Sequence, residues 1–356
     1  MEKIRLGCVG MGRRGQSMFA LATQFANVEA AAFCDQRSET LASMRERYPQ
    51  ARGFGDFREM LDQGGIDALL VETPADNHAA FCMAALQQNL HVLSDIPCVN
   101  SVEEAELLWA AAARSSAWMM VGANPNLWGF VEAMTDLYRQ GLLGEPYYLE
   151  AEYIHDLRSL FEQTPWRKTY PPIQYCTHSL GPLLRIMKED LRMVSCFTTG
   201  SKINREPGQN DLMTAQFQTD GGVVLRLTVS FINNAGCGMH SYRVFGTEGY
   251  FERLSERGRV PARTAFKSNK LYGADALTEL NVDMLRPEYA GRADVAGHGG
   301  VDYALLDRFF AALRDDAATA PISLREGLRM SLPGLYAVES ARRGGEVLSI
   351  RYPWDK

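Results

Sequence analysis

A glycine-rich turn near the N-terminus constrains the fold of this chain more than any other feature. Residues 10–15 are Gly-Met-Gly-Arg-Arg-Gly; they follow an apolar run, Ile4–Val9, and precede a helical pattern at Ser17–Phe25. In a GxGxxG turn the first glycine permits a tight bend, the second lets the backbone approach a pyrophosphate, and the third lets the helix pack closely on the strand. Because this turn joins a strand to a helix, the sequence predicts a dinucleotide-binding β-α-β unit.

The first 123 residues alternate short apolar runs with amphipathic segments. The runs are apolar throughout, which is typical of strands in a parallel sheet that helices cover on both faces. Further strands are expected at Val28–Cys34, Ile66–Val71, His91–Leu93 and Trp118–Val121, and further helices at Glu39–Tyr48, Ala75–Gln88 and Val102–Ala113. We therefore predict an α/β fold for residues 1–123, a Rossmann domain with a doubly wound parallel sheet.

Residues 124–356 have a different pattern, in which strand-like runs follow one another and Gly221-Gly222 is suited to a hairpin turn. The expected strands are Tyr147–Ile154, Met193–Thr199, Leu212–Thr219, Val223–Phe231, His240–Phe245 and Tyr250–Arg253, and the expected helices are Leu127–Gln140, Ser179–Met187, Asp302–Leu313 and Leu324–Ala341. Residues 255–294 have little periodicity and are expected to form a long loop. This pattern predicts a second domain, of the α+β class, with a large, open and mainly antiparallel sheet.

Charge and cysteine usage limit the partners and the compartment. The net charge is −6 and no basic run stands out, so we expect neither nucleic acid nor a membrane as a partner. The seven cysteines are dispersed without CxxC spacing, which favours reduced thiols in the cytoplasm over disulfides, and no metal site is expected. The start of the chain has no signal-peptide pattern, so a cytoplasmic protein is expected.

Asp35 ends the second expected strand, where it is placed to accept hydrogen bonds from an adenosine ribose. A carboxylate there would repel a 2′-phosphate, so NAD is favoured over NADP, although Arg37 could weaken this preference. Two later segments follow strand ends, where open α/β sheets bind ligands. The predicted cofactor contacts are Gly10, Met11, Gly12, Arg13, Asp35, Thr73, Pro74, His78, Asp95 and Pro97. For His78 an exposed helix-start residue is an equally weighted alternative.

The chain resembles the glucose–fructose oxidoreductase/inositol dehydrogenase (Gfo/Idh/MocA) family. The resemblance is carried by the glycine-rich start, by Thr73-Pro74-x-x-x-His78 and by His91-Val92-x-x-x-x-Pro97, and it extends over the whole chain. It implies that a sugar binds one face of the C-terminal sheet, near the nicotinamide, and that the other face mediates association. A homo-oligomer, a dimer or a tetramer, is therefore expected.

Two of the three usual catalytic groups of the family's dehydrogenases are replaced. Those enzymes carry Glu-Lys-Pro where this chain has Asp95-Ile96-Pro97, so the lysine is absent. They also carry an aspartate four residues before the catalytic histidine; His178 matches the histidine, but the aspartate position is Gln174. Of the three groups that the family's dehydrogenases use to oxidise an alcohol, this chain therefore has only the histidine, His178.

Residues 175–182, Tyr-Cys-Thr-His-Ser-Leu-Gly-Pro, are similar to the NAD-dependent glycoside hydrolases of this superfamily, typified by bacterial α-N-acetylgalactosaminidases. Residues 153–156 (Tyr-Ile-His-Asp), the pair Trp166-Arg167 and residues 297–302 also fit that branch. The resemblance implies transient oxidation of a ring hydroxyl at C3, removal of the C2 proton, loss of the C1 substituent, addition of water and re-reduction. NAD would then be tightly bound and recycled.

His178 is the predicted group for proton exchange with the oxidised hydroxyl, because imidazole titrates near neutral pH; capping of the helix near Ser179 is the alternative. Tyr153 and Tyr175 are candidates for the C2 base or for orienting the sugar, with aromatic packing as the alternative. A phenol needs a lowered pKa or a neighbouring base to act in this way. The predicted substrate contacts are His155, Asp156, Trp166, Arg167, Tyr289 and His298. His91 and His240 are interpreted as structural.

Three functions remain open from the sequence. The first is an NAD-dependent enzyme that cleaves a glycoside without net redox change. The second is a net dehydrogenase of a sugar or cyclitol that uses His178 with a tyrosine. The third is a non-catalytic sensor of NAD or of a sugar, which the loss of the lysine and the aspartate leaves possible.

Overall fold

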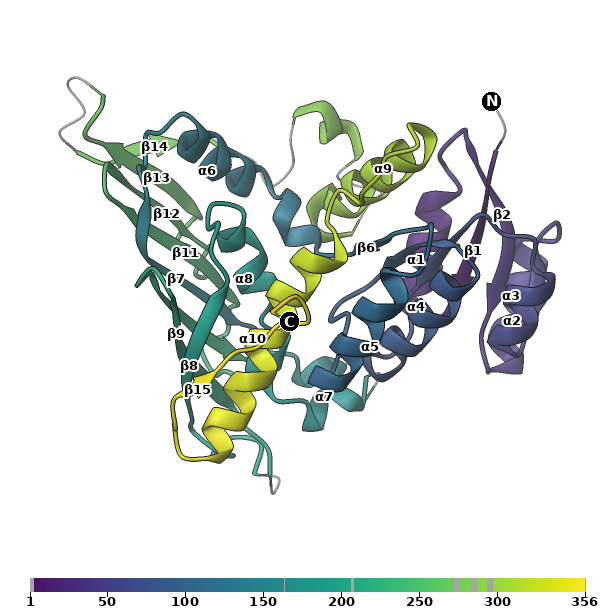
Figure 1. Ribbon diagram of the computed structural model, residues 1–356, viewed down its shortest axis with the longest axis horizontal. Coiled ribbons are helices and arrows are strands. Elements are labelled where there is room, and N and C mark those ends of the chain that lie inside the picture. The colour runs from purple at the N-terminus through teal and green to yellow at the C-terminus, as the bar shows by residue number, and fades with distance from the viewer. Residues whose placement is uncertain are drawn as a thin grey trace. The chain divides into compact units, whose positions relative to one another are not determined.

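The computed structural model describes residues 3–162, 164–205, 208–271, 276–282, 287–292 and 297–355. The chain forms two compact units (Figure 1). The first contains Met1–Asn124 and Leu285–Leu328, and the second contains Pro125–Met284 and Arg329–Asp355.

This division into compact units differs from the predicted domain boundary, which assigns residues 124–356 to one domain. The helix α9 (Val301–Arg314) belongs to the first unit, because its aromatic side chains pack on that unit's core. The ring of Tyr303 stacks on Phe25 with centroids 4.6 Å apart, and Phe310 meets Phe25 edge-on at 5.1 Å. Val121 donates its backbone N–H to the carbonyl of Ile322, which ties the later stretch to the sheet. The periodicity of a helix does not indicate which unit it joins.

The first unit is built on a six-stranded, wholly parallel sheet in the order β3-β2-β1-β4-β5-β6. Its strands are β1 (Ile4–Val9), β2 (Val28–Cys34), β3 (Arg52–Phe54), β4 (Ala68–Val71), β5 (His91–Ser94) and β6 (Met119–Val121). All residues of β4 and β6 are buried, as strands covered on both faces require. The doubly wound parallel sheet predicted from the sequence is confirmed.

Helices connect these strands: α1 (Arg13–Ala22), α2 (Ser38–Arg47), α3 (Phe57–Gln63), α4 (His78–Gln87) and α5 (Val102–Ala112). Local capping explains where two of them begin. The Asp56 carboxylate accepts the backbone N–H groups of Arg58 and Glu59 at the start of α3, and the Ser101 hydroxyl accepts that of Glu104 at the start of α5. The sequence analysis missed β3 and α3, since both are shorter than the window over which periodicity is visible.

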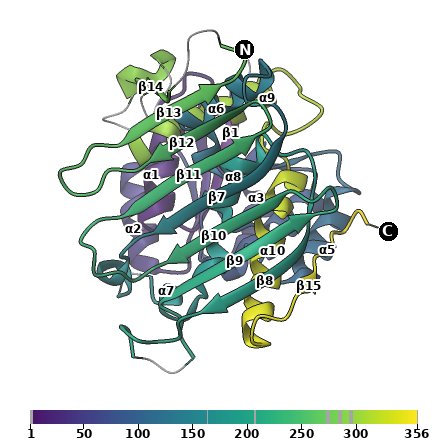
Figure 2. The same cartoon turned by 90° about the vertical axis from the view of Figure 1, so that its left-hand side faces the viewer.

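The second unit contains a nine-stranded sheet in the order β14-β13-β12-β11-β7-β10-β9-β8-β15 (Figure 2). Its strands are β7 (Pro146–Ile154), β8 (Leu191–Thr198), β9 (Leu212–Thr219), β10 (Val224–Ser230), β11 (Met239–Gly246), β12 (Gly249–Leu254), β13 (Arg263–Ser268), β14 (Thr278–Leu280) and β15 (Leu348–Ser349). Only β7 and β10 pair in parallel, so the mainly antiparallel sheet is confirmed. The turn at Gly221-Gly222 joins β9 to β10 as predicted.

The expectation of a long loop over residues 255–294 is wrong. This stretch contains β13 and β14, which extend the sheet beyond β12. Both strands lie at the margin of the sheet, and β14 is its edge strand. Strands near an edge carry charged residues such as Arg263 and Glu279, so their apolar pattern is weak in the sequence.

One face of this sheet carries the buried side chains of β7, namely Leu149, Ala151 and Tyr153. The helix α8 (Thr177–Leu184) and the short 3₁₀ turn η4 (Pro172–Tyr175) pack on that face, against β7, β9 and β10. The remaining helices of the unit are α6 (Gly129–Arg139), α7 (Trp166–Thr169) and the part of α10 (Leu324–Arg342) beyond residue 328. None of the described helices is long and apolar enough to cross a membrane.

Candidate active site

The glycine turn has the geometry that a dinucleotide requires. Gly10 has φ +90°, and a Cβ there would lie 2.7 Å from the carbonyl oxygen of Glu72, so only glycine fits. A Cβ on Gly15 would lie 1.8 Å from the carbonyl oxygen of Gly10, which shows how closely α1 approaches β1. A Cβ on Gly12 would meet no described atom within 4 Å, so this side of the turn is open to a pyrophosphate at the start of α1. The residues present therefore fit a dinucleotide.

Asp35 is held in place by hydrogen bonds at the end of β2. Its Oδ2 accepts the backbone N–H of Met11 at 2.9 Å, and its Oδ1 accepts the backbone N–H and Nε–H of Arg37 at 2.9 and 3.1 Å. Burial alone would raise the pKa of Asp35, but the hydrogen bonds from Arg37 and Met11 lower it below its usual value. The carboxylate is therefore charged near neutral pH, beside an arginine that is mostly exposed.

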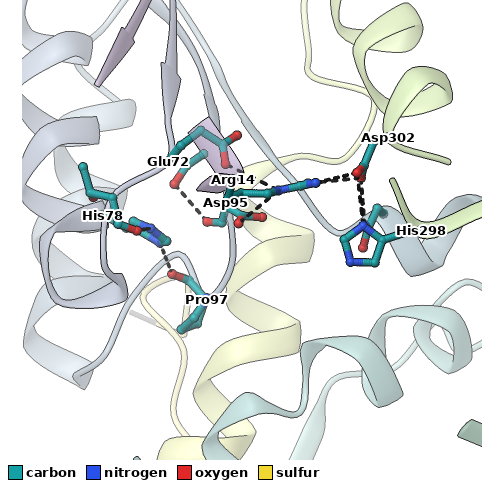
Figure 3. Close-up of polar contacts among 10 residues, drawn as sticks. Arg14, Glu72, His78, Asp95, Pro97, His298 and Asp302 are labelled. Carbon is teal, nitrogen blue, oxygen red and sulfur yellow. Dashed lines mark hydrogen bonds and ion pairs between the residues drawn. The ribbon is translucent and has the colours of Figure 1, made fainter. Parts of the chain in front are cut away.

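The segments that follow β4 and β5 lie beside the glycine turn, because β1, β4 and β5 are neighbours in the sheet. His78 links the two segments: its Nε2 lies 2.8 Å from the carbonyl oxygen of Thr73 and its Nδ1 lies 2.8 Å from that of Pro97 (Figure 3). His78 is 2% exposed. Both hydrogen-bonding atoms of the ring are thus engaged with the backbone, and the structure assigns His78 to holding Thr73 and Pro97 rather than to direct contact with a cofactor.

Arg14, in the glycine turn, faces three carboxyl groups (Figure 3). Its Nη1 and Nη2 donate to Oδ2 and Oδ1 of Asp302 at 2.5 and 3.1 Å. Its Nε lies 3.6 Å from a carboxylate oxygen of Glu72 and 3.6 Å from one of Asp95. We call Arg14, Glu72, Asp95 and Asp302 the Arg14 cluster.

The Arg14 cluster shifts the pKa values of two of its acids in opposite directions. Burial, together with the charge of Asp95, raises the pKa of Glu72 well above its ordinary value. Burial would also raise the pKa of Asp302, but hydrogen bonds from His298 and the charge of Arg14 lower it instead. One guanidinium therefore pairs with Asp302, while Glu72 favours its protonated form.

His298 precedes α9 in a glycine-flanked turn, with φ +56°. Its Nδ1 lies 3.1 Å from Oδ2 of Asp302, whose side chain is 1% exposed, whereas the side chain of His298 is 46% exposed. A buried carboxylate thus orients an imidazole that a ligand can reach. The side-chain amide of Asn124 donates to Oδ1 of Asp302 at 3.0 Å and so also holds this carboxylate in place.

His178 lies in the first turn of α8 and is 7% exposed. Pro182, four residues later, has no N–H to donate to the carbonyl of His178. The hydroxyl of Tyr242, from β11, donates to that carbonyl at 2.7 Å instead. Gly181 lets the helix approach closely, since a Cβ there would lie 2.1 Å from Oδ1 of Asn126. The sequence His-Ser-Leu-Gly-Pro therefore fixes the position of His178 in the folded protein.

Tyr153 is the centre of a group of aromatic and imidazole rings in the second unit. Its ring centroid lies 4.3 Å from that of His240, 5.2 Å from that of His178 and 6.0 Å from that of Tyr175. Its hydroxyl lies 3.2 Å from Nδ1 of His155. We call Tyr153, His155, Tyr175, His178 and His240 the Tyr153 cluster. The structure brings together both predicted tyrosines and both predicted histidines of this unit.

His240, which the sequence analysis interprets as structural, also lies in this cluster. Its ring centroid is 4.3 Å from that of Tyr153, with the ring planes inclined by 30°, and 5.8 Å from that of His155. Burial raises the pKa of Tyr153, and the nearby charge of Arg167 opposes this only in part. The raised pKa disfavours an ionised phenol at Tyr153, and Nδ1 of His155 lies within hydrogen-bond distance of its hydroxyl.

The other predicted substrate contacts have varied surroundings. The carboxylate of Asp156 forms an ion pair with Arg158 at 2.5 Å. The guanidinium carbon of Arg167 lies 4.4 Å from the ring centroid of Trp166 and 5.2 Å from that of Tyr175.

The hydroxyl of Tyr289 donates to Asp307 at 2.9 Å in the first unit. His91 accepts the backbone N–H of Trp118 at 3.3 Å, as a structural residue would.

Sequence reasoning did not single out four residues of these two clusters, Arg14, Glu72, Asp302 and His240, nor Tyr242, which donates to the His178 carbonyl. Arg14 lies inside the recognised GxGxxG turn and Asp302 inside the string at 297–302, so both could have been singled out. Nothing in the sequence indicated that they meet. Among the described residues, no three histidine, cysteine, aspartate or glutamate side chains gather in a way that could hold a metal ion.

The fold and the glycine turn define a class: proteins that bind a dinucleotide on a parallel α/β unit and carry a second unit with a large antiparallel sheet. Two family descriptions match the chain, "Oxidoreductase family, NAD-binding Rossmann fold" over residues 4–123 and "GFO/IDH/MocA C-terminal domain" over residues 131–252. The chain belongs to the Gfo/Idh/MocA family of NAD-binding oxidoreductases, and the resemblance stated from its motifs is confirmed.

Relatives with assigned names are enzymes. A "Glycosyl hydrolase family 109 protein 1" from Shewanella sp. (strain MR-4) is 30% identical over 360 residues, which cover 89% of this chain and 78% of that protein. An "Alpha-N-acetylgalactosaminidase" from Shewanella oneidensis is 30% identical over 206 residues, covering 52% of this chain and 45% of that protein.

Solved structures share the fold at lower identity. A levoglucosan dehydrogenase in complex with NADH and L-sorbose superposes with a TM-score of 0.82 at 17% identity, covering 99% of this chain and 100% of that one. An inositol dehydrogenase homologue from Azotobacter vinelandii, complexed with NADH and myo-inositol, has a TM-score of 0.79 at 21% identity, with 98% of each chain covered.

Proposed function

We propose that this protein is an NAD-dependent enzyme that cleaves a glycoside without net redox change. The observation that carries the proposal is the Tyr153 cluster, in which a buried phenol is surrounded by three imidazoles. Such a set can move protons near neutral pH, as successive removal and return of protons on a sugar ring requires. The names of the glycosidase relatives support the same reaction class.

Binding of the cofactor is assigned to the first unit. Gly10, Met11, Gly12 and Arg13 would hold the pyrophosphate, and Asp35 the adenosine ribose. Thr73, Pro74, Asp95 and Pro97 would border the nicotinamide, with His78 supporting two of them. When bound, NAD supplies reversible oxidation of a ring hydroxyl. The charged Asp35 favours NAD over NADP, because a 2′-phosphate would lie against a carboxylate.

Proton movements are assigned to the chain's own side chains. His178 takes the proton of the hydroxyl that becomes a ketone, which acidifies the C–H at C2. Tyr153 passes its hydroxyl proton to His155 across the 3.2 Å contact and removes the C2 proton, and the C1 substituent then departs with the electrons of its bond to C1. Further substrate contacts are assigned to His298, which Asp302 orients, and to Trp166 with Arg167. The cycle closes when water adds to the enone at C1, C2 regains its proton, and the ketone is reduced to the alcohol, which regains its proton from His178.

One experiment separates the open functions. The purified protein, with no cofactor added, is incubated with p-nitrophenyl and methyl glycosides while aglycone release and nicotinamide absorbance are followed together. Release over many turnovers without net NADH supports the proposal. NADH build-up that needs added NAD, without aglycone release, makes the protein a net sugar or cyclitol dehydrogenase. A protein that binds sugars but gives neither signal with any substrate would overturn both catalytic readings.

Cytoplasmic location and association into a dimer or tetramer remain predictions. Size-exclusion chromatography with light scattering would test the second, and a monomer at micromolar concentration would contradict it.

A further inference from the structure

Arg167 is a cation without a counter-charge in the part of the chain that the structure describes. Its guanidinium carbon stacks over the rings of Trp166 and Tyr175, at 4.4 and 5.2 Å from their centroids. No described carboxylate forms an ion pair with it, and its Nε is buried with no hydrogen-bond partner among the described residues. Aromatic faces stabilise such a cation. They do not accept hydrogen bonds from its N–H groups, which point outward in the plane of the guanidinium.

Trp128 contributes a second buried donor beside the Tyr153 cluster. The residue is 5% exposed, and its ring centroid lies 5.9 Å from that of His240, which in turn lies 4.3 Å from that of Tyr153. Its Nε1 is buried with no acceptor among the described residues. An indole N–H only donates, so it needs an acceptor that no described residue supplies.

Two acidic side chains near the cluster already pair with other arginines. Glu152 pairs with Arg257 at 3.0 Å, and Asp156 pairs with Arg158 at 2.5 Å. Two buried donors, Nε of Arg167 and Nε1 of Trp128, thus have no acceptor among the described residues. Buried polar groups in native proteins are nearly always satisfied, so these two donors indicate a ligand that supplies acceptors.

We propose that the sugar bound by the Tyr153 cluster is a sugar acid, whose carboxylate binds Arg167. The proposal rests on the proposed function only in taking the ligand to be a sugar. A planar guanidinium matches a carboxylate through two parallel N–H···O contacts, and the Nε edge is one side of that fork. A phosphate is less well suited, because α7 is only four residues long and the cluster offers one permanent cation. Trp128 donates to a further oxygen of the same sugar.

The test compares matched sugars on the NAD-loaded protein by calorimetry and by tryptophan fluorescence. Galacturonate and glucuronate are each compared with galactose and glucose, in the wild type, Arg167→Gln and Lys168→Gln. We expect the wild type to bind the hexuronate of a pair at least tenfold more tightly, about 1.4 kcal/mol. The difference should shrink as salt is added. Arg167→Gln should abolish it, whereas Lys168→Gln, which removes the adjacent exposed charge, should preserve it.

Other outcomes overturn the inference. Equal affinity for acid and neutral sugars in the wild type removes its basis. The proposal is also wrong if the wild type does not prefer the acid sugars and Arg167→Gln lowers kcat on a neutral glycoside. Arg167 then acts on charge that develops during the reaction. Acid preference that is lost in Arg167→Gln supports the inference even if no glycoside is cleaved, in which case the proposed function fails and the ligand class stands.

Discussion

Arg14 and Asp302, which are 288 residues apart in the chain, form a two-contact ion pair in the first unit, with distances of 2.5 and 3.1 Å. The pair connects the glycine turn to the start of α9, and Asp302 in turn orients His298. It therefore links the segment predicted to bind NAD with a residue predicted to bind substrate.

Replacing Arg14 should destabilise the first unit. Arg14→Gln leaves Asp302 buried without its cation, and removal of one partner of a buried pair typically costs about 3–5 kcal/mol. Because Arg14 itself is 26% exposed, we expect the lower end of that range in urea unfolding. Arg13→Gln, at the exposed neighbouring position, should change the free energy of unfolding by less than about 0.5 kcal/mol. Equal effects of the two variants would contradict a special role for Arg14.

Glu72 makes stability depend on pH in a defined direction. Its pKa is raised in the folded protein above the unfolded value of about 4.3, so its contribution is complete below that pH and is lost as pH rises through the folded pKa. Glu72→Gln cannot ionise, so it should abolish this loss of folding stability at high pH. The loss amounts to about 1.4 kcal/mol for each unit by which the folded pKa exceeds the unfolded pKa. Thermal unfolding from pH 4 to pH 9 measures it, with the exposed Glu29→Gln as control. A Glu72→Gln protein whose unfolding shows the wild-type pH dependence would refute the assignment.

Loss of the His178 imidazole should impair chemistry and spare cofactor binding. His178→Ala is expected to reduce turnover by a factor of about 10² to 10⁴, the usual contribution of a general acid–base group. NAD released on denaturation should be unchanged, because His178 lies in the second unit. Tyr242→Phe deprives the His178 carbonyl of its donor and should cost about 1–3 kcal/mol of stability with a smaller loss of turnover. Normal turnover of His178→Ala would rule out its assigned role.

Tyr153 and His155 should act as one unit. If the phenol works through the imidazole at 3.2 Å, Tyr153→Phe and His155→Ala each lower kcat, and the double variant loses little more than the worse single variant. Initial rates at saturating substrate provide the cycle, and the NAD content of each variant serves as control. Strictly multiplicative losses would show that the two residues act independently.

Asp35 should set the cofactor preference through Arg37. Asp35→Ser removes the carboxylate that we propose to bind the adenosine ribose and releases Arg37 from the contacts at 2.9–3.1 Å. We expect the ratio of NAD to NADP affinity to fall by at least tenfold. The double variant Asp35→Ser/Arg37→Gln should lose the gain in NADP affinity, since no cation remains for the 2′-phosphate. A single variant that binds NADP no better than the wild type would argue against this arrangement.

Local physics explains what the sequence by itself determined. Apolar runs at β1, β2 and β4, together with the glycine turn, specify a parallel sheet with a dinucleotide site, because buried strands and tight turns require particular residues at adjacent positions. The family resemblance, rather than local physics, pointed to His178, Tyr153 and Tyr175, which the structure brings together in one cluster.

Only the tertiary structure decided which distant residues meet. Nothing local to Arg14 specifies Asp302, and nothing in β11 specifies that His240 stacks on Tyr153, since both contacts arise from strand order and helix packing across long separations. The membership of α9 in the first unit and the pairing of β13 with β14 near the sheet edge also depended on tertiary packing. Such packing leaves only a weak pattern in the local sequence. The fold class was therefore readable from neighbouring residues, whereas the electrostatics of the site followed from contacts that folding alone creates.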